Sequence, residues 1–340
     1  MNKGGNNLSI SAKITRQLKV NLLNSVNHKI NKEKALKSSG AIFWKVFRFS
    51  ILFGLSFVLI YPLLYSLSVS FRPFEELFDP SVIWIPKHFT LINIKDAFQA
   101  MDYPSSFLRT IGLNVVSSFL EVASCALTGY GFARFKFKGK NLLFSMVLFT
   151  IIVPSQSTII PMYVSYRYFD FFGIGKLISL FTGTNMSINL LDTNWTFYIP
   201  SMLGVGLRAG LFIYIFRQFF RGLPKELEEA AYIDGCGPFS TFIKVMLPNS
   251  FQSMLTVLIL SVVWHWNEYY LTSMFFLNKW TISTALTGMT SHLNDTNLNP
   301  YAFVCKMQSG SLLAILPILI MYIVLQKYFT ESIERTGIVG

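Results

Sequence analysis

The chain alternates between long apolar runs and shorter polar connections. The hydrocarbon core of a membrane is about 30 Å thick, so a helix that crosses it needs about 20 mostly apolar residues. We therefore expect an all-α polytopic membrane protein with six transmembrane helices. The six runs that meet this length are Phe49–Phe71, Phe107–Ala133, Leu142–Val164, Ile199–Phe220, Phe251–Phe275 and Ser309–Phe329.

The composition also indicates a membrane protein. Of the 340 residues, 52% are hydrophobic and 14% are charged, whereas soluble domains carry about 25% charged residues. Most of the net charge of +12 lies in residues 1–46, which we interpret as a basic cytoplasmic tail attracted to anionic lipid rather than to nucleic acid. The tail lacks the apolar core of a signal peptide. Residues 47–340 then form the transmembrane domain.

The positions of Lys and Arg predict the orientation, because short basic connections remain in the cytoplasm. The second connection, Arg134–Lys140, is basic, and the fourth holds Arg217 and Lys244. These alternate with the acidic first connection, so both termini are expected in the cytoplasm. In the third connection, the Gly and Asn content of the insertion 173–198 predicts an outer loop.

The inner segment 223–250 is too polar to cross the membrane and predicts a helix–turn–helix on its surface. Its first helix begins with a proline and three glutamates, which suit a helix N-terminus. Gly235 stands where a left-handed C-terminal cap would end that helix. Pro238 suits the start of a second helix, and we expect Pro248 to end it.

Two adjacent small residues in this segment favour close docking of a partner, and a hairpin that only joins two spans is the alternative. The segment resembles the EAA loop of permease subunits of bacterial ATP-binding-cassette importers. By this resemblance it docks into a cleft of a cytoplasmic ATPase subunit. The matching residues are Glu229, Ala230, Ala231, Gly235, Val245, Leu247 and Pro248, with Val245 in place of the usual isoleucine.

Other stretches are similar to the smaller, six-span subunit of the maltose-type sugar permeases. They are WIPKHFTLINIKDAF (84–98), LTGYGFARFKFKGK (127–140), VPSQSTIIPMY (153–163) and WNEYY (266–270). The resemblance runs from about Phe47 to Gly340, and the tail and the 173–198 insertion lie outside it.

The resemblance implies a permease in the bacterial cell membrane that forms half of a sugar pathway by alternating access. Such a chain is not an enzyme and binds no cofactor itself, because ATP and Mg are held by the partner ATPase subunits. The implied partners are a second homologous permease, two cytoplasmic ATPase subunits, an extracellular solute-binding protein and membrane lipid, but no nucleic acid.

Two sets of polar residues within the predicted spans are candidates for the sugar pathway. A charge at the middle of a membrane costs about 2.5–3.5 kcal/mol, so Glu121 either forms a structural hydrogen bond or lines the pathway. The second set combines aromatic faces with polar edges, which suits a sugar, although an interfacial aromatic belt is the alternative. It comprises Trp264, Trp266, Asn267 and Glu268, with His265 between them.

Other functions predict different features. A secondary transporter that needs no ATPase would couple an ion through groups such as Glu121 or His265, and an importer of a non-sugar solute is a further alternative. A membrane enzyme would need a nucleophile–base or metal constellation, and the sequence shows none that convinces. The three scattered cysteines, Cys125, Cys236 and Cys305, predict neither a disulfide framework nor a metal site.

Overall fold

The computed structural model describes residues 42–171, 173–183, 187–294 and 299–336. Within these ranges the regular secondary structure is helical, apart from an isolated β-bridge between Phe169 and Ile188, and loops connect the helices. The chain divides after Tyr65 into two units, and the second contains every element from η1 to α15. The elements are the helix Ile42–Ser70, η1 (Phe74–Phe78), α2 (Ile92–Ala100), α3 (Tyr103–Arg134), α4 (Lys140–Ile152), α5 (Ser155–Arg167), α6 (Ile174–Thr182), α7 (Trp195–Met202), α8 (Ala209–Gly222), α9 (Glu226–Ile233), α10 (Pro238–Thr241), the π-helix η2 (Phe242–Met246), α11 (Leu247–Asn249), α12 (Phe251–Asn267), α13 (Tyr270–Phe275), α14 (Ile282–Asn294) and α15 (Pro300–Thr336).

Three of the predicted spans are single long helices. Ile42–Ser70, Tyr103–Arg134 and Pro300–Gln326 within α15 are each long and apolar enough to cross a membrane. They correspond to the predicted first, second and sixth spans. The all-α polytopic membrane fold expected from the sequence is therefore confirmed.

The prediction of unbroken helices for the third and fourth spans was wrong. The axes of α4 and α5 meet at 102°, because Pro154 holds Val153 in extended backbone and so ends α4. The fourth predicted span divides into α7 and α8. The break lies at Gly204 and Arg208, which both have left-handed backbone.

The fifth predicted span is also divided, since α12 ends at Asn267 and α13 begins at Tyr270. The carboxylate of Glu268 accepts a hydrogen bond of 2.7 Å from the backbone N–H of Leu271 and so caps the new helix. At its other end, α12 turns by 78° from the segment Pro238–Asn249. With each bent pair of helices counted as one span, the described residues hold up to five spans by length and hydropathy.

The insertion 173–198 is not the continuous loop that its Gly and Asn content predicts. It contains α6 and the first turns of α7. In α6, Ile174, Leu177, Ile178 and Phe181 recur at the spacing of one helix face. This apolar periodicity favours a helix despite Gly175 in its first turn, and Gly173 and Gly183 flank it.

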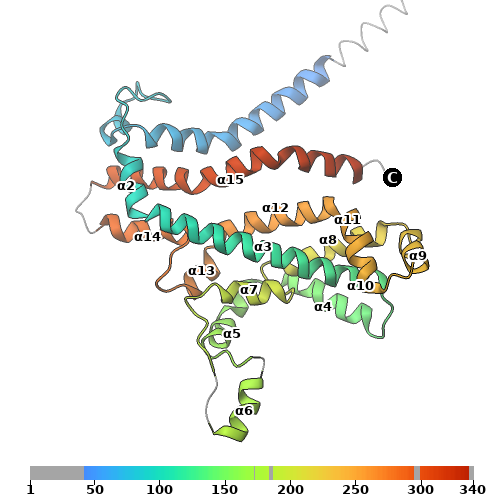
Figure 1. Cartoon of the computed structure of the whole chain (residues 1–340). Helices are drawn as coiled ribbons and strands as arrows, with labels where there is room; N and C mark the ends of the chain where they lie inside the picture. The colour runs from blue at the N-terminus through green and yellow to red at the C-terminus, as the bar shows by residue number, and fades with distance from the viewer. Residues whose placement is uncertain (1–41, 172, 184–186, 295–298, 337–340) are drawn as a thin grey trace, which may run out of the picture. The chain divides into compact units, whose positions relative to one another are not determined.

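Helix α3 runs through the middle of the second unit and packs most extensively against α8 (Figure 1). One face of α3 is lined with small and polar residues, so neighbouring backbones approach it closely. A Cβ atom on Gly129 would lie 2.6 Å from Cβ of Phe216. Bulky side chains of α8 and α12 fill the space beside this face. The buried cluster comprises Val122, Cys125, Ala126, Tyr130, Ala209, Phe212, Ile213, Phe216, Phe220, Phe242, Met246 and Val257.

Side chains of α3 also form hydrogen bonds with backbone groups of many other elements. In a membrane such groups have no water to bind, so each must find a partner within the protein. The contacts are Tyr103 Oη to Leu313 O (3.0 Å), Ile282 N to Thr110 Oγ1 (2.8 Å), Asn114 Nδ2 to Val262 O (2.8 Å), Ser124 Oγ to Ser201 O (2.5 Å) and Arg134 Nη2 to Leu223 O (2.7 Å). These hydrogen bonds connect α3 to α7, α12, α14, α15 and the connection between α8 and α9.

The contact of Tyr103 has a specific cause in α15. Pro317 has no N–H to donate to the carbonyl of Leu313, four residues earlier in the helix. Tyr103 supplies the missing donor, and the indole Nε1 of Trp266 donates to the adjacent carbonyl of Ala314 at 3.0 Å. Two side chains from α3 and α12 therefore stabilise the proline site of α15.

Replacing Tyr103 by Phe should lower the free energy of unfolding by about 1 kcal/mol, because the Leu313 carbonyl loses its donor. In a Pro317→Ala background the same change should cost less, since the backbone N–H introduced at position 317 can bind that carbonyl. Thermal unfolding of the purified full-length chain in detergent measures the loss of stability caused by Tyr103→Phe in each of the two backgrounds. An equal loss in the two backgrounds would contradict this explanation.

Candidate coupling and translocation sites

The segment 223–250 forms the two helices that the sequence predicts. The first, α9, ends at Ile233, and Gly235 follows with a φ of 82°, as a left-handed cap requires. The second begins at Pro238 but does not end before Pro248. It passes through the π-helix η2 into α11 and ends at Asn249. The wider π turn suits a following proline, whose ring clashes with the carbonyl of an ordinary α-helix.

The EAA residues divide between the surface and the interior. Glu229 and Ala230 are exposed, whereas Ala231 is only 5% exposed and packs inside its own chain. The sequence predicts a docking face that includes both alanines, whereas the structure exposes only Ala230. Ile233 is 86% exposed, and Phe239 also presents its side chain to the surface. These residues place acidic and apolar groups on the surface of the segment.

The remaining EAA residues shape the loop. Gly235 supplies the turn, Leu247 is half-buried against the core cluster beside α3, and Pro248 is exposed at the end of the segment. Substitution of Gly235 would strain the backbone, because other residues rarely adopt its conformation. The pattern therefore encodes the geometry of the loop as well as its surface.

A buried ion pair joins the segment 223–250 to α3. Nε of Arg134, the last residue of α3, lies 3.4 Å from Oε2 of Glu228 in α9, and both side chains are largely buried. Arg134 also donates to the carbonyl of Leu223 at 2.7 Å, just before α9. Sequence reasoning missed Glu228 because nothing in its immediate surroundings distinguishes it from the other acids of the first turn.

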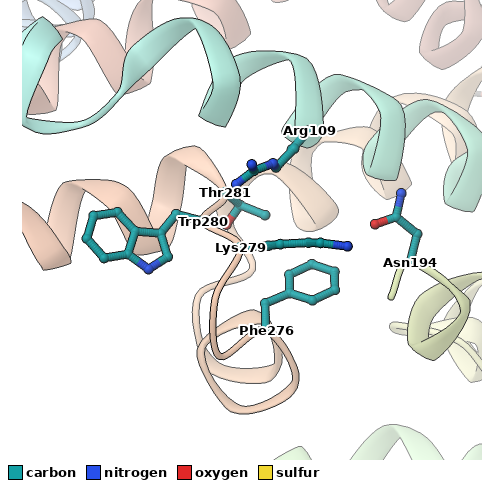
Figure 2. Close-up of a pocket in the computed structure, with 6 residues that line it drawn as sticks. All are labelled: Arg109, Asn194, Phe276, Lys279, Trp280 and Thr281. Atoms are coloured by element: carbon teal, nitrogen blue, oxygen red, sulfur yellow. The ribbon is translucent and has the colours of Figure 1, made fainter. Parts of the chain in front are cut away.

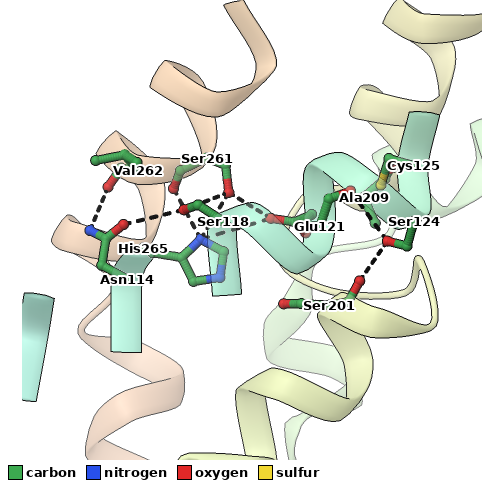
Figure 3. A network of polar contacts seen from close by, with 10 residues as sticks. All are labelled: Asn114, Ser118, Glu121, Ser124, Cys125, Ser201, Ala209, Ser261, Val262 and His265. Carbon is green, nitrogen blue, oxygen red and sulfur yellow. Dashed lines mark hydrogen bonds and ion pairs between the residues drawn. The ribbon is translucent and has the colours of Figure 1, made fainter. Parts of the chain in front are cut away.

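Glu121 lies in a polar network between α3 and α12 (Figure 3). It is 0% exposed, and Ser261 donates to its Oε2 at 2.8 Å. Nδ1 of His265 lies 3.0 Å from the carbonyl oxygen of Ser261 and 3.8 Å from the same carboxylate oxygen. Ser118, which donates to Asn114 at 3.2 Å, extends the network along α3. Oε2 of Glu121 is thus hydrogen-bonded, whereas Glu121 Oε1 and His265 Nε2 are buried without a hydrogen-bond partner among the described residues.

The other carboxylate oxygen of Glu121 faces the break between α7 and α8. A Cβ atom on Gly206 would lie 2.7 Å from Glu121 Oε1 and 2.9 Å from Ser201 Oγ. Only glycine fits at this position without displacing one of them. Glu121 therefore contacts both of its neighbouring broken spans through its two oxygens.

The candidates of the fifth span do not converge on one point, because consecutive residues of a helix point in different directions. Trp264 packs against Phe212 with ring centroids 5.4 Å apart. Trp266 is buried on the side of α15, where it donates to Ala314. Asn267 is exposed and bonds to its own helix at 2.8 Å. Glu268 caps α13.

Metal binding has no support in the part of the chain that the structure describes. No group of three or more His, Cys, Asp or Glu side chains gathers there in a geometry that could hold a metal ion. The thiols of Cys125, Cys236 and Cys305 are free.

Comparison with known proteins identifies the family. Residues 126–334 match the sequence pattern of a family described as "binding-protein-dependent transport system inner membrane component". The chain belongs to this family. This transport family is a family of membrane permeases, not of enzymes, and the EAA segment and α12 both lie within the matched range.

Relatives within the binding-protein-dependent family cover most of the chain. The arabinooligosaccharides transport system permease protein AraQ of Halalkalibacterium halodurans is 29% identical over 84% of this chain and 93% of its own length. The trehalose transport system permease protein SugB of Mycobacterium tuberculosis is 26% identical over 82% and 92%. A chain of a bacterial ABC transporter for import of the acidic polysaccharide alginate has the same fold, with a TM-score of 0.63, 19% identity, and coverage of 84% of this chain and 96% of that chain.

The ion pair between α3 and α9 can be tested by removing one charge. Glu228→Gln leaves Arg134 buried without its counter-charge, so the free energy of unfolding should fall by about 3 kcal/mol. Glu226→Gln is the matched control, because Glu226 is exposed on the same helix. Thermal unfolding of the purified chain distinguishes the two. Identical midpoints for both variants would show that the pair does not hold α9.

Proposed function

We propose that this chain is the smaller permease subunit of an ATP-driven importer for a sugar or oligosaccharide. The EAA segment supports this proposal most directly, because it presents Glu229 and Ala230 on the surface while Glu228 fixes the same helix to α3. The similar permeases named for arabinooligosaccharides and trehalose support a saccharide as the substrate. The match to a binding-protein-dependent transport family favours an importer with partner subunits over an ion-coupled transporter that works alone.

The mechanism that we propose is alternating access. The chain forms half of a pathway, and a second homologous permease forms the other half. Two ATPase subunits bind ATP and Mg in the cytoplasm, and one of them docks on α9. Because the Arg134–Glu228 pair is buried, movement of α9 on ATP binding is transmitted to α3 and thereby to the helices that hydrogen-bond to it. An extracellular solute-binding protein delivers the sugar, and both termini lie in the cytoplasm.

The exposed half of the EAA segment provides the test of coupling. Ala230→Trp should prevent the ATPase from docking by steric clash, and Glu229→Lys should weaken docking by reversing a charge. Both chains should still insert, because no membrane-spanning helix changes. Uptake of sugar by cells should fall by about tenfold or more, and copurification of the ATPase should fall with it.

The control for the coupling test is Glu75→Lys, a charge reversal at a residue far along the chain from α9. It should leave uptake and copurification unchanged. Ala231→Trp is unsuitable, because Ala231 is buried and its enlargement would disturb the chain itself. If Ala230→Trp and Glu229→Lys transport as well as the control, the segment is a connector and the proposed coupling is wrong.

The proposed orientation predicts opposite labelling of two lysine positions. In a Cys236→Ser background, Lys95→Cys in α2 should react with an impermeant maleimide in intact cells, whereas Lys138→Cys should react only after permeabilisation. The remaining cysteines, Cys125 and Cys305, are buried and should not react with the maleimide. If only Lys138→Cys were labelled in intact cells, the orientation would be the opposite of the one that we propose.

A further inference from the structure

A small pocket lies near the N-terminal end of α3, at the opposite end of that helix from Arg134. Its volume is about 150 Å³, and it is formed by α3, the N-cap of α7 and the loop between α13 and α14. The lining residues are Arg109, Asn194, Phe276, Lys279, Trp280 and Thr281. Figure 2 shows Arg109 reaching from α3 on one side, Lys279 extending toward Asn194, and the ring of Phe276 beneath Lys279.

The pocket carries two positive charges that the described chain does not neutralise. Neither Arg109 nor Lys279 forms an ion pair with any residue whose side chain the structure describes. The nearby carboxylate of Asp192 is occupied, since it accepts hydrogen bonds from Leu277 N at 2.6 Å, Asn278 N at 3.0 Å and Asn278 Nδ2 at 3.1 Å. An anion that entered the pocket would therefore meet unpaired cations.

The loop that carries Lys279 is held in place on both sides. Asp192 fixes its beginning through the three bonds just described. Its end is fixed by the backbone N–H of Ile282, which donates to Thr110 at 2.8 Å, and by that of Thr281, which donates to Thr284 at 2.8 Å. Thr110 is the neighbour of Arg109 in α3, so the same contact brings the two cations together. A preorganised site loses less entropy when it binds a ligand.

The chemistry of the lining points to one class of ligand. A cavity of about 150 Å³ holds one six-membered ring. The ring of Phe276 offers an apolar wall that suits the C–H face of a sugar ring, and the Asn194 amide suits a hydroxyl. Arg109 and Lys279 suit a carboxylate, which guanidinium groups bind strongly. Inorganic phosphate would use the charges but not the aromatic wall of Phe276.

We infer that this pocket binds the carboxylate of an acidic saccharide, such as a uronic acid unit, at the mouth of the pathway. The inference rests on the proposed importer function, whose orientation puts this end of α3 outside the cell. Arg109 and Arg134 are 25 residues apart on α3, about 37 Å along its axis at about 1.5 Å per residue. The pocket therefore lies on the side from which substrate arrives, far from the coupling segment.

Transport by the assembled complex in proteoliposomes tests the inference, with the second permease, the ATPases and the binding protein present. The probes are radiolabelled α-1,4-linked digalacturonate and its uncharged counterpart, α-1,4-linked digalactose. ATP-driven uptake of digalacturonate should fall about tenfold or more in the double variant Arg109→Gln and Lys279→Gln, because both charge-assisted contacts are lost. Uptake of any uncharged saccharide that the complex transports should be unchanged. Lys95→Gln, which removes a charge on α2, is the matched control and should behave as the original protein does.

The inference is overturned if the double variant takes up digalacturonate as fast as the original complex. Three further results would also overturn it, and they differ in what they say of the proposed function. If the original complex transports uncharged saccharides but not digalacturonate, the pocket does not select acids while the importer function stands. If the double variant slows acidic and uncharged substrates equally, and the binding protein stimulates its ATPase activity less, the cations bind a carboxylate of that protein instead. If the complex transports no saccharide of either kind, the proposed function fails as well.

Discussion

The close packing of other helices against one face of α3 is the constraint on which the second unit of the chain depends. Lipid offers no hydrogen bonds, so a helix that is interrupted within a membrane exposes backbone groups that must be satisfied by protein. The small and polar face of α3 meets this need. Gly129 permits close approach of α8, while Asn114 and Ser124 bind carbonyls of α12 and α7 directly.

This arrangement explains why broken helices are tolerated. The interruption between α7 and α8 lies beside Ser124 and Glu121, and the proline of α15 lies beside Tyr103. Each of these two sites thus has a side chain from α3 beside it. A break is also a place where helices can change direction with little loss of hydrogen bonding, which suits the alternating access that we propose.

The two ends of α3 carry different chemistry. Its last residue, Arg134, is buried against Glu228 and connects the helix to the segment that we propose as the ATPase docking site. Near its first turns, Arg109 faces the pocket that we assign to an acidic saccharide. A single rigid helix between the two sites provides a physical route for coupling, since displacement of one end moves the other.

Local patterns along the chain are sufficient to predict the class of the protein, because apolar runs of about 20 residues and basic connections reflect the thickness and charge of a membrane. Local patterns also predict the turn after α9, because the left-handed backbone at Gly235 favours glycine. The spacing of the EAA residues indicates the family in the same way. All of these features depend on residues that are neighbours in the chain, so a linear pattern records them.

Which residues meet depends instead on tertiary packing. Ala230 and Ala231 are adjacent and identical in type, yet one is exposed and the other is buried, because α9 packs on one side against the rest of the chain. The run from Trp264 to Glu268 forms one cluster in the sequence, but a helix turns by about 100° at each residue and separates its members. The Arg134–Glu228 pair and the pocket at Arg109 join residues from distant segments. Their partners are fixed by packing around α3, a constraint that no local pattern records.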